Sequence, residues 1–149
     1  MNNQNISQEQ WTIWKPIEDL PSKCWLNVVN ETPSHQLMIL LSDRKGSCTI
    51  SLKFNHNVPM YKVSEETCTI DLLYDVIGKY GDDFIHASTF FIIRNSSYVE
   101  WLVHESNGLL QADSLNHYCI FGIDSVVDII AAEEPEVTIT YNDPEQSKN

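Results

Sequence analysis

The alternation of apolar and polar residues in the first part of the chain predicts β-structure. Residues 48–54 alternate strictly, with a period of two that places one face of a strand in the core and the other in water. Residues 37–41 are apolar on both faces, which is typical of a central strand, although the pattern also allows a buried helical turn. Turn-forming residues at 43–46 separate the two runs. The sequence therefore predicts a β-hairpin over residues 37–54.

Residues 65–80 follow a helical period instead, because their apolar side chains recur at intervals of three and four. Ser64 is suited to cap the N-terminus of a helix, and Glu65 and Glu66 follow where the helix dipole favours negative charge. Gly81 is suited to the C-terminal cap. These signals predict one main amphipathic helix over about residues 65–80.

The remaining segments are predicted to add strands and a short helix. Segments rich in β-branched and aromatic residues are predicted as strands: residues 87–94, 98–104, 117–123 and 137–141. Asp124 is suited to cap a short helix over about residues 124–132, which Pro135 ends. Pro59 limits residues 58–63 to an edge strand or an irregular connection. The predicted fold class is α+β, with a mostly antiparallel sheet, one main helix and one short helix.

The size and composition of the chain predict a single globular domain over residues 1–149. Its 149 residues, of which 42% are hydrophobic, bury enough surface to fold without disulfide bonds or a metal. The polar residues 1–10 and 142–149 are predicted to be mobile. The polar start lacks the apolar run of a signal peptide, and no segment has the roughly 18 apolar residues of a membrane span. These features predict a cytoplasmic protein without a membrane anchor.

The cysteines and tryptophans carry expectations about burial. The four cysteines are widely spaced in apolar surroundings and are predicted to be buried, reduced thiols: Cys24, Cys48, Cys68 and Cys119. The tryptophans are expected to pack in the core or at its edge, with an aromatic anchor at an interface as the alternative. Trp11 and Trp14 lie in the polar N-terminal region and are expected to be the more exposed pair.

The net negative charge is confined to the second part of the chain. Residues 1–60 are neutral, whereas residues 61–149 hold 16 acidic and four basic residues and carry the whole formal charge of −12. This balance argues against direct contact with nucleic acid, which needs clustered Lys and Arg. It favours a basic partner protein, with solubility alone as the alternative. The candidate partner-binding residues are Asp82, Asp83, Glu133, Glu134 and Glu136.

No motif in the chain predicts catalysis, a cofactor or a metal. The histidines lack the spacing of metal ligands, and a zinc site from His104, His117 and Cys119 stays a minor alternative. A nucleophile pair of Cys119 and His117 has no recognisable oxyanion hole or orienting acid beside it. The paired carboxylates are adjacent in sequence, so they do not converge on one substrate atom. The chain is therefore expected to act by binding and not as an enzyme.

Residues 98–137 carry an ordered series of short segments: YVEWL at 98–102, ESNG at 105–108, HYCI at 117–120, DSVVDII at 124–130 and EPEV at 134–137. In this series the chain resembles small bacterial immunity proteins, which are the antidotes to polymorphic and contact-dependent growth inhibition toxins. The resemblance implies a cytoplasmic, non-catalytic protein that binds one toxin domain and covers its active site or another surface that it needs. Such toxins are often basic nucleases, for which an acidic partner is suited.

Two other functions stay open on the sequence. An acidic mimic of nucleic acid would inhibit a nucleic-acid enzyme, and its acids would follow a phosphate-like stripe. An enzyme or a small-ligand domain would need a deep pocket with convergent polar groups.

Overall fold

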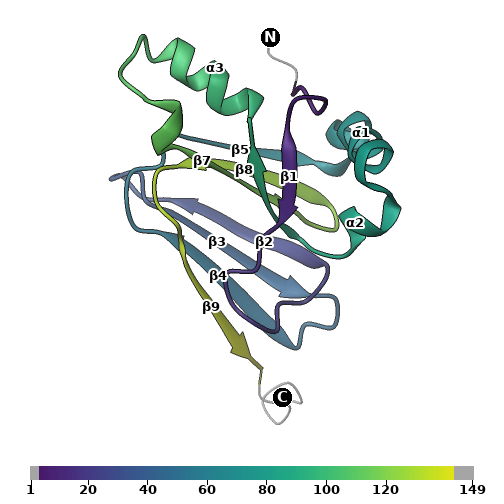
Figure 1. Ribbon diagram of the computed structural model, residues 1–149. Coiled ribbons are helices and arrows are strands. Elements are labelled where there is room, and N and C mark those ends of the chain that lie inside the picture. The colour runs from purple at the N-terminus through teal and green to yellow at the C-terminus, as the bar shows by residue number, and fades with distance from the viewer. Residues whose placement is uncertain (1–3, 143–149) are drawn as a thin grey trace.

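Two antiparallel β-sheets form the framework of the computed structural model, which describes residues 4–142 (Figure 1). The five-stranded sheet has the order β1-β6-β7-β8-β5, and the four-stranded sheet has the order β2-β3-β4-β9. The strands are β1 (Gln10–Ile13), β2 (Cys24–Glu31), β3 (Leu37–Asp43), β4 (Cys48–Phe54), β5 (Met60–Glu65), β6 (Phe90–Arg94), β7 (Asn116–Phe121), β8 (Ser125–Ala131) and β9 (Glu136–Tyr141). The helices are α1 (Ile70–Tyr80), α2 (Asp82–His86) and α3 (Ser97–Glu105), with the 3₁₀ segments η1 (Glu66–Thr69) and η2 (Ala112–Ser114). The predicted α+β class is confirmed.

The five-stranded sheet lies between two apolar cores. Its strand β7 shows this, because Tyr118 and Ile120 pack against the four-stranded sheet, whereas Cys119 and Phe121 pack under α1 and α2. Side chains of a strand point alternately to opposite faces, so a strand covered on both faces is apolar throughout. The four-stranded sheet has only one covered face, and its strand β4 alternates between buried and more exposed residues.

The hairpin and the main helix are confirmed. Strands β3 and β4 pair antiparallel from Leu37 opposite Phe54, as the alternation predicts. The helix predicted over residues 65–80 is formed by η1 and α1 together, and Gly81, which has φ 94°, caps its C-terminus. Its N-terminal cap is Glu65 and not the predicted Ser64: the carboxylate of Glu65, the last residue of β5, accepts the amide hydrogen of Thr67. Strand β5 lies at the edge of its sheet, as Pro59 predicts.

Two secondary-structure predictions are wrong: one predicted strand is a helix, and one predicted helix is a strand. The predicted strand over residues 98–104 is helix α3, which begins where the Ser96 hydroxyl accepts the amide hydrogen of Val99 at 3.1 Å. The predicted short helix over residues 124–132 is strand β8, which pairs with β7 on one side and β5 on the other. Both faces of β8 are buried, so its apolar run lacks the alternation that marks a half-exposed strand.

Residues 4–10, which belong to the predicted mobile arm, include residues that are buried in the domain. Glu9 has no exposed surface and Ile6 is buried, while Gln10 begins strand β1. Trp11 and Trp14 are buried in the two cores, which contradicts their expected exposure. Residues 1–3 of the predicted arm and 143–149 of the predicted tail lie outside the described residues. Within the described part of the chain, no helix has the length and apolarity that crossing a membrane requires.

Three of the four cysteines are buried as predicted, and Cys68 in η1 is exposed. Burial raises the pKa of the Cys24 and Cys48 thiols and raises that of Cys119 well above its usual range. Because a thiolate is the reactive form, burial and a raised pKa both disfavour reaction at Cys24, Cys48 and Cys119, whereas Cys68 is accessible.

We expect a thiol reagent at neutral pH to modify only Cys68 in the native protein and all four cysteines after unfolding. The number of adducts is read by intact-mass spectrometry. A Cys68→Ser variant provides the control and should take up no reagent while folded. Two or more adducts on the folded wild-type protein would contradict the burial described above.

Candidate functional site

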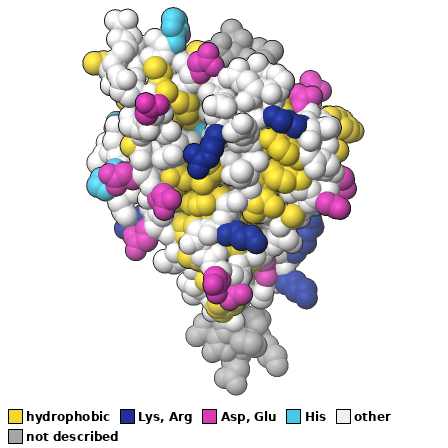
Figure 2. Space-filling model, viewed as in Figure 1, with side chains coloured by type: hydrophobic (Ala, Val, Ile, Leu, Met, Phe, Trp, Pro, Cys, Tyr) yellow, Lys and Arg dark blue, Asp and Glu magenta, His cyan; other side chains and the backbone are white. Residues whose placement is uncertain are grey.

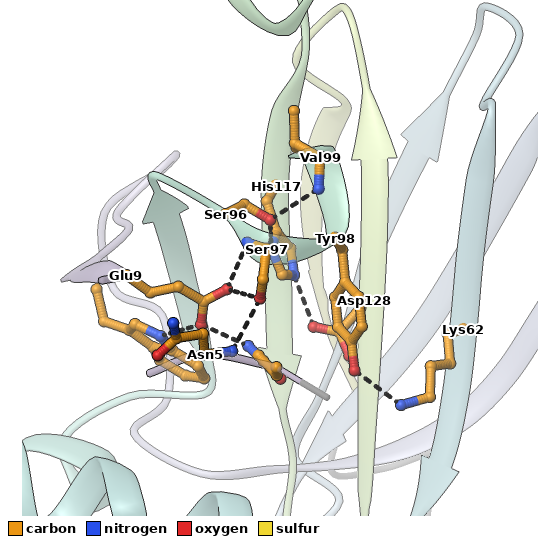
Figure 3. A network of polar contacts seen from close by, with 11 residues as sticks. Asn5, Glu9, Lys62, Ser96, Ser97, Tyr98, Val99, His117 and Asp128 are labelled. Carbon is orange, nitrogen blue, oxygen red and sulfur yellow. Dashed lines mark hydrogen bonds and ion pairs between the residues drawn. The ribbon is translucent and has the colours of Figure 1, made fainter. Parts of the chain in front are cut away.

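A chain of hydrogen bonds joins helix α3 to the centre of the five-stranded sheet (Figure 3). The Ser96 hydroxyl lies 2.7 Å from His117 Nδ1, and His117 Nε2 lies 2.7 Å from a carboxylate oxygen of Asp128. His117 is on β7 and Asp128 is on the neighbouring strand β8. All three side chains are buried, which makes their mutual contacts obligatory, because a buried polar group without a partner is strongly unfavourable.

A serine, a histidine and an aspartate in contact form the side-chain set of one kind of nucleophilic catalysis. In this chain the contacts differ, because serine contacts Nδ1 and aspartate contacts Nε2. A carboxylate only accepts, so His117 Nε2 donates to Asp128, and this pairing lets Nδ1 accept the hydrogen of the Ser96 hydroxyl. Ser96 in turn accepts the amide hydrogen of Val99 and is only 6% exposed. The arrangement fits an anchor for α3.

Glu9 provides a second anchor at the same end of α3 (Figure 3). Its carboxylate accepts the backbone amide hydrogen of Ser97 at 3.0 Å and the Ser97 hydroxyl at 2.8 Å. It also accepts from Gln4 and from the indole of Trp11. The N-terminus of a helix favours a negative charge, and the four hydrogen bonds that the Glu9 carboxylate accepts make its complete burial tolerable. Segment 4–11 and α3 are thereby held together.

Helices α1 and α2 cover the outer side of the sheet and carry much of the negative charge. Helix α1 buries Val76 against the sheet and exposes the opposite side, where Ile70 is 47% and Tyr74 is 67% exposed. Asp71 and Asp75 are exposed on the same side, because residues four apart on a helix share a face. We call the following exposed set the acidic helical face: Glu66, Ile70, Asp71, Tyr74, Asp75, Asp82 and Asp83.

Little positive charge offsets the acidic helical face. Lys79 is the only Lys or Arg between residues 66 and 86. Its ammonium group donates to the carbonyl oxygens of Ile6 and Glu9 and is thereby held against the N-terminal segment. In the space-filling view, acidic side chains lie along the margin formed by α1 and α2, while hydrophobic side chains gather near the middle (Figure 2).

The structure separates the predicted partner-binding residues into two groups. Asp82 and Asp83 open α2 and belong to the acidic helical face. Glu133 and Glu134 lie in the turn after β8, and Glu136 begins β9; all three are exposed. The start of β8 and the end of α2 line one pocket and are therefore close together. The turn after β8 lies at the other end of that strand, roughly 20 Å from α2. The prediction thus combines two surfaces.

The second group of acids is partly engaged within the protein. A carboxylate oxygen of Glu133 lies 2.9 Å from His56 Nε2, and Glu136 accepts from the side-chain amide of Asn55 at 3.3 Å. The corresponding contact in the first group is Asp82 with His86 at 3.5 Å. Asp71 and Asp75 have no ion-pair partner among residues 4–142. The acidic helical face therefore presents the freer negative charge.

Sequence reasoning missed Ile70 and Tyr74, although the sequence carries their signal. The predicted buried stripe of the main helix includes Leu72, Leu73 and Val76, which leaves two large apolar residues on the other side. Ile70 and Tyr74 are four residues apart and flank acidic positions. Exposed apolar residues within a polar rim are typical of protein interaction surfaces.

The minor alternative of a zinc site has no support in the geometry. His104 is exposed on α3, whereas His117 and Cys119 are buried on β7. Among residues 4–142, no three His, Cys, Asp or Glu side chains are grouped so that they could hold a metal ion.

Comparison with known proteins identifies no similar protein. The chain matches no protein-family model, no curated protein sequence and no solved structure. Any functional conclusion therefore depends on the residues and their arrangement.

Proposed function

We propose that this protein is a cytoplasmic, non-catalytic immunity protein that neutralises a cognate toxin domain by binding it through the acidic helical face. The observation that carries the proposal is the combination of five acids with two exposed apolar side chains on one helical layer. The resemblance of residues 98–137 to immunity proteins points to the same class of protein.

The charge of this face argues for a basic partner. Residues 66–83 hold five acidic residues and the single base Lys79, whose ammonium contacts backbone oxygens. Opposite charges on two proteins raise the rate of their association and disfavour wrong partners. Nuclease domains are basic where they contact phosphates, so a toxin with nuclease activity fits this surface.

The exposed apolar side chains of the acidic helical face provide the lasting affinity that charge alone does not. Lasting affinity comes mostly from a few well-packed residues that are desolvated at the centre of an interface, and tyrosine is enriched among them. Tyr74 and Ile70 lie between Asp71, Asp75 and Glu66 on the exposed side of η1 and α1. This arrangement has a central anchor and a charged rim, as in stable interfaces.

We expect the product of the adjacent gene to be the toxin, the protein to form a stoichiometric complex with it, and this complex to restore growth of cells that express the toxin. Complex formation is measured by light scattering after size-exclusion chromatography of the two purified proteins. Growth is compared with and without the protein at equal toxin expression. Separate elution of the two proteins, together with unchanged growth inhibition, would contradict the proposal.

A further inference from the structure

A small pocket lies beside Lys23, between the helical layer and the segment that joins β7 to β8. Its volume is about 190 Å³, and its apolar lining includes Leu73, Ile85 and Phe121. A dry cavity of about 150 Å³ lined by apolar side chains holds one benzene molecule. The pocket therefore has room for a compact organic molecule.

Lys23 is the unusual member of this lining. The residue is 7% exposed, and its ammonium group donates to the carbonyl oxygen of Phe121 at 2.6 Å. The ammonium also lies 5.1 Å from the ring centroid of Phe121 and 5.8 Å from that of Phe91. Among residues 4–142, no carboxylate lies within ion-pair distance of it. Buried ammonium groups are normally paired with an anion, because an unpaired buried charge is strongly unfavourable.

Burial lowers the pKa of the Lys23 ammonium to about 8, so most of the amine is still charged at neutral pH. An ammonium group has three hydrogens to donate, and Phe121 accepts one of them. The carbonyl oxygen of Phe121 is the one hydrogen-bond acceptor of this ammonium among the described residues, and Lys23 is part of the pocket lining. A buried cation with unused donors at the wall of a cavity is a site for an anion.

We propose that this pocket binds a small organic monocarboxylate, whose carboxylate pairs with the ammonium of Lys23 and whose apolar body packs on Phe121, Leu73 and Ile85. Arg44 also lines the pocket and adds positive charge. Glu66 and Asp124 line it as well and repel ligands of higher negative charge, such as phosphate esters. A single negative charge with an apolar body satisfies both conditions. The pocket shares Glu66 and Ile70 with the acidic helical face, but carboxylate binding by Lys23 does not rest on the proposed toxin interface.

Benzoate is the probe that matches the pocket in size and charge, and benzamide is its neutral control of the same shape. We expect saturable binding of benzoate to the full-length protein, with amide chemical-shift changes in residues 121–126. Benzamide should bind at least about tenfold more weakly, since it lacks the charge that pairs with Lys23. Binding is measured by NMR titration at pH 7. Equal affinities for the two compounds, or no saturable shifts with benzoate, would overturn the proposal.

The Lys23→Met variant removes the ammonium and keeps much of the side-chain volume. We expect it to lose benzoate binding by at least about tenfold, whereas Lys15→Met, at an exposed position, should leave binding unchanged. The wild-type protein gives a test that does not depend on a variant. Its affinity for benzoate should fall roughly tenfold for each pH unit above the Lys23 pKa of about 8.

The other titratable and charged groups around Lys23 are Arg44, Glu66, His86 and Asp124, which line the pocket, and Cys24 and Cys119, whose pKa is raised by burial. An affinity that does not change between pH 7 and 9.5, or full binding by Lys23→Met, would contradict a contact between the carboxylate and Lys23.

Discussion

Replacing His117 with alanine should lower the free energy of unfolding by about 3–5 kcal/mol, because it leaves the buried carboxylate of Asp128 without its partner. His117 and Asp128 are 1% and 2% exposed, so water does not replace the lost contact. The same substitution also removes the acceptor of the Ser96 hydroxyl and thereby loosens the start of α3. The loss is measured by equilibrium unfolding in urea.

The control for this substitution is His104→Ala, at an exposed position on α3, which should change the stability by less than about 0.5 kcal/mol. Ser96→Ala is the milder test, with an expected loss of about 1 kcal/mol from the helix cap. It remains informative if His117→Ala does not fold. A loss below about 1 kcal/mol for His117→Ala would show that Asp128 does not depend on this contact.

Substitutions on the acidic helical face should weaken toxin binding without unfolding the protein. Tyr74→Ala removes the proposed anchor and should reduce affinity by at least about 2 kcal/mol, which is roughly 30-fold. Asp71→Lys with Asp75→Lys should slow association by about tenfold or more at low salt, because it replaces attraction by repulsion. Affinities and rates are measured by surface plasmon resonance with the toxin domain immobilised.

A matched control is available at the other end of β8. Glu133→Lys with Glu134→Lys changes the net charge by the same amount, yet lies away from the acidic helical face. We expect its effect on association to be several-fold smaller, since exposed charges separated by more than about 8–10 Å are largely screened. All four positions are exposed, so each substitution should change the stability by no more than about 0.5 kcal/mol. Equal effects of the two double variants would exclude the acidic helical face as the interface.

The local sequence predicts well those strands and helices that bury only one of their faces. Strand β4 and the segment η1–α1 each cover a core with one face, so their periods of two and of three to four are visible in the sequence. Strand β8 is buried on both faces and has no such period. Helix α3 carries the residues Tyr98, Val99 and Trp101, which favour strands, and contacts outside the helix decide its conformation.

The buried polar contacts depend on the fold and leave no local pattern. Glu9 and Ser97 are 88 residues apart in the sequence, and Ser96 and His117 are 21 apart. A charge count identifies the acidic part of the chain but does not tell which acids share a surface. For this reason the candidate set joined Asp82 and Asp83 to Glu133, Glu134 and Glu136. Tyr74 was available to sequence reasoning, because it lies outside the apolar stripe of a helix that was correctly predicted.

The most direct test of the proposed function is the dependence of the association rate on salt for the protein and the product of the adjacent gene, which the proposal expects to be the toxin. We expect the wild-type rate to fall about tenfold or more between roughly 0.05 and 0.5 M salt, while the dissociation rate changes little. The Asp71→Lys, Asp75→Lys variant should show a flat or inverted dependence, and the Glu133→Lys, Glu134→Lys variant should follow the wild type. A wild-type rate that does not change with salt, or a helical variant that matches it at every concentration, would contradict the proposal that this face recruits a basic toxin.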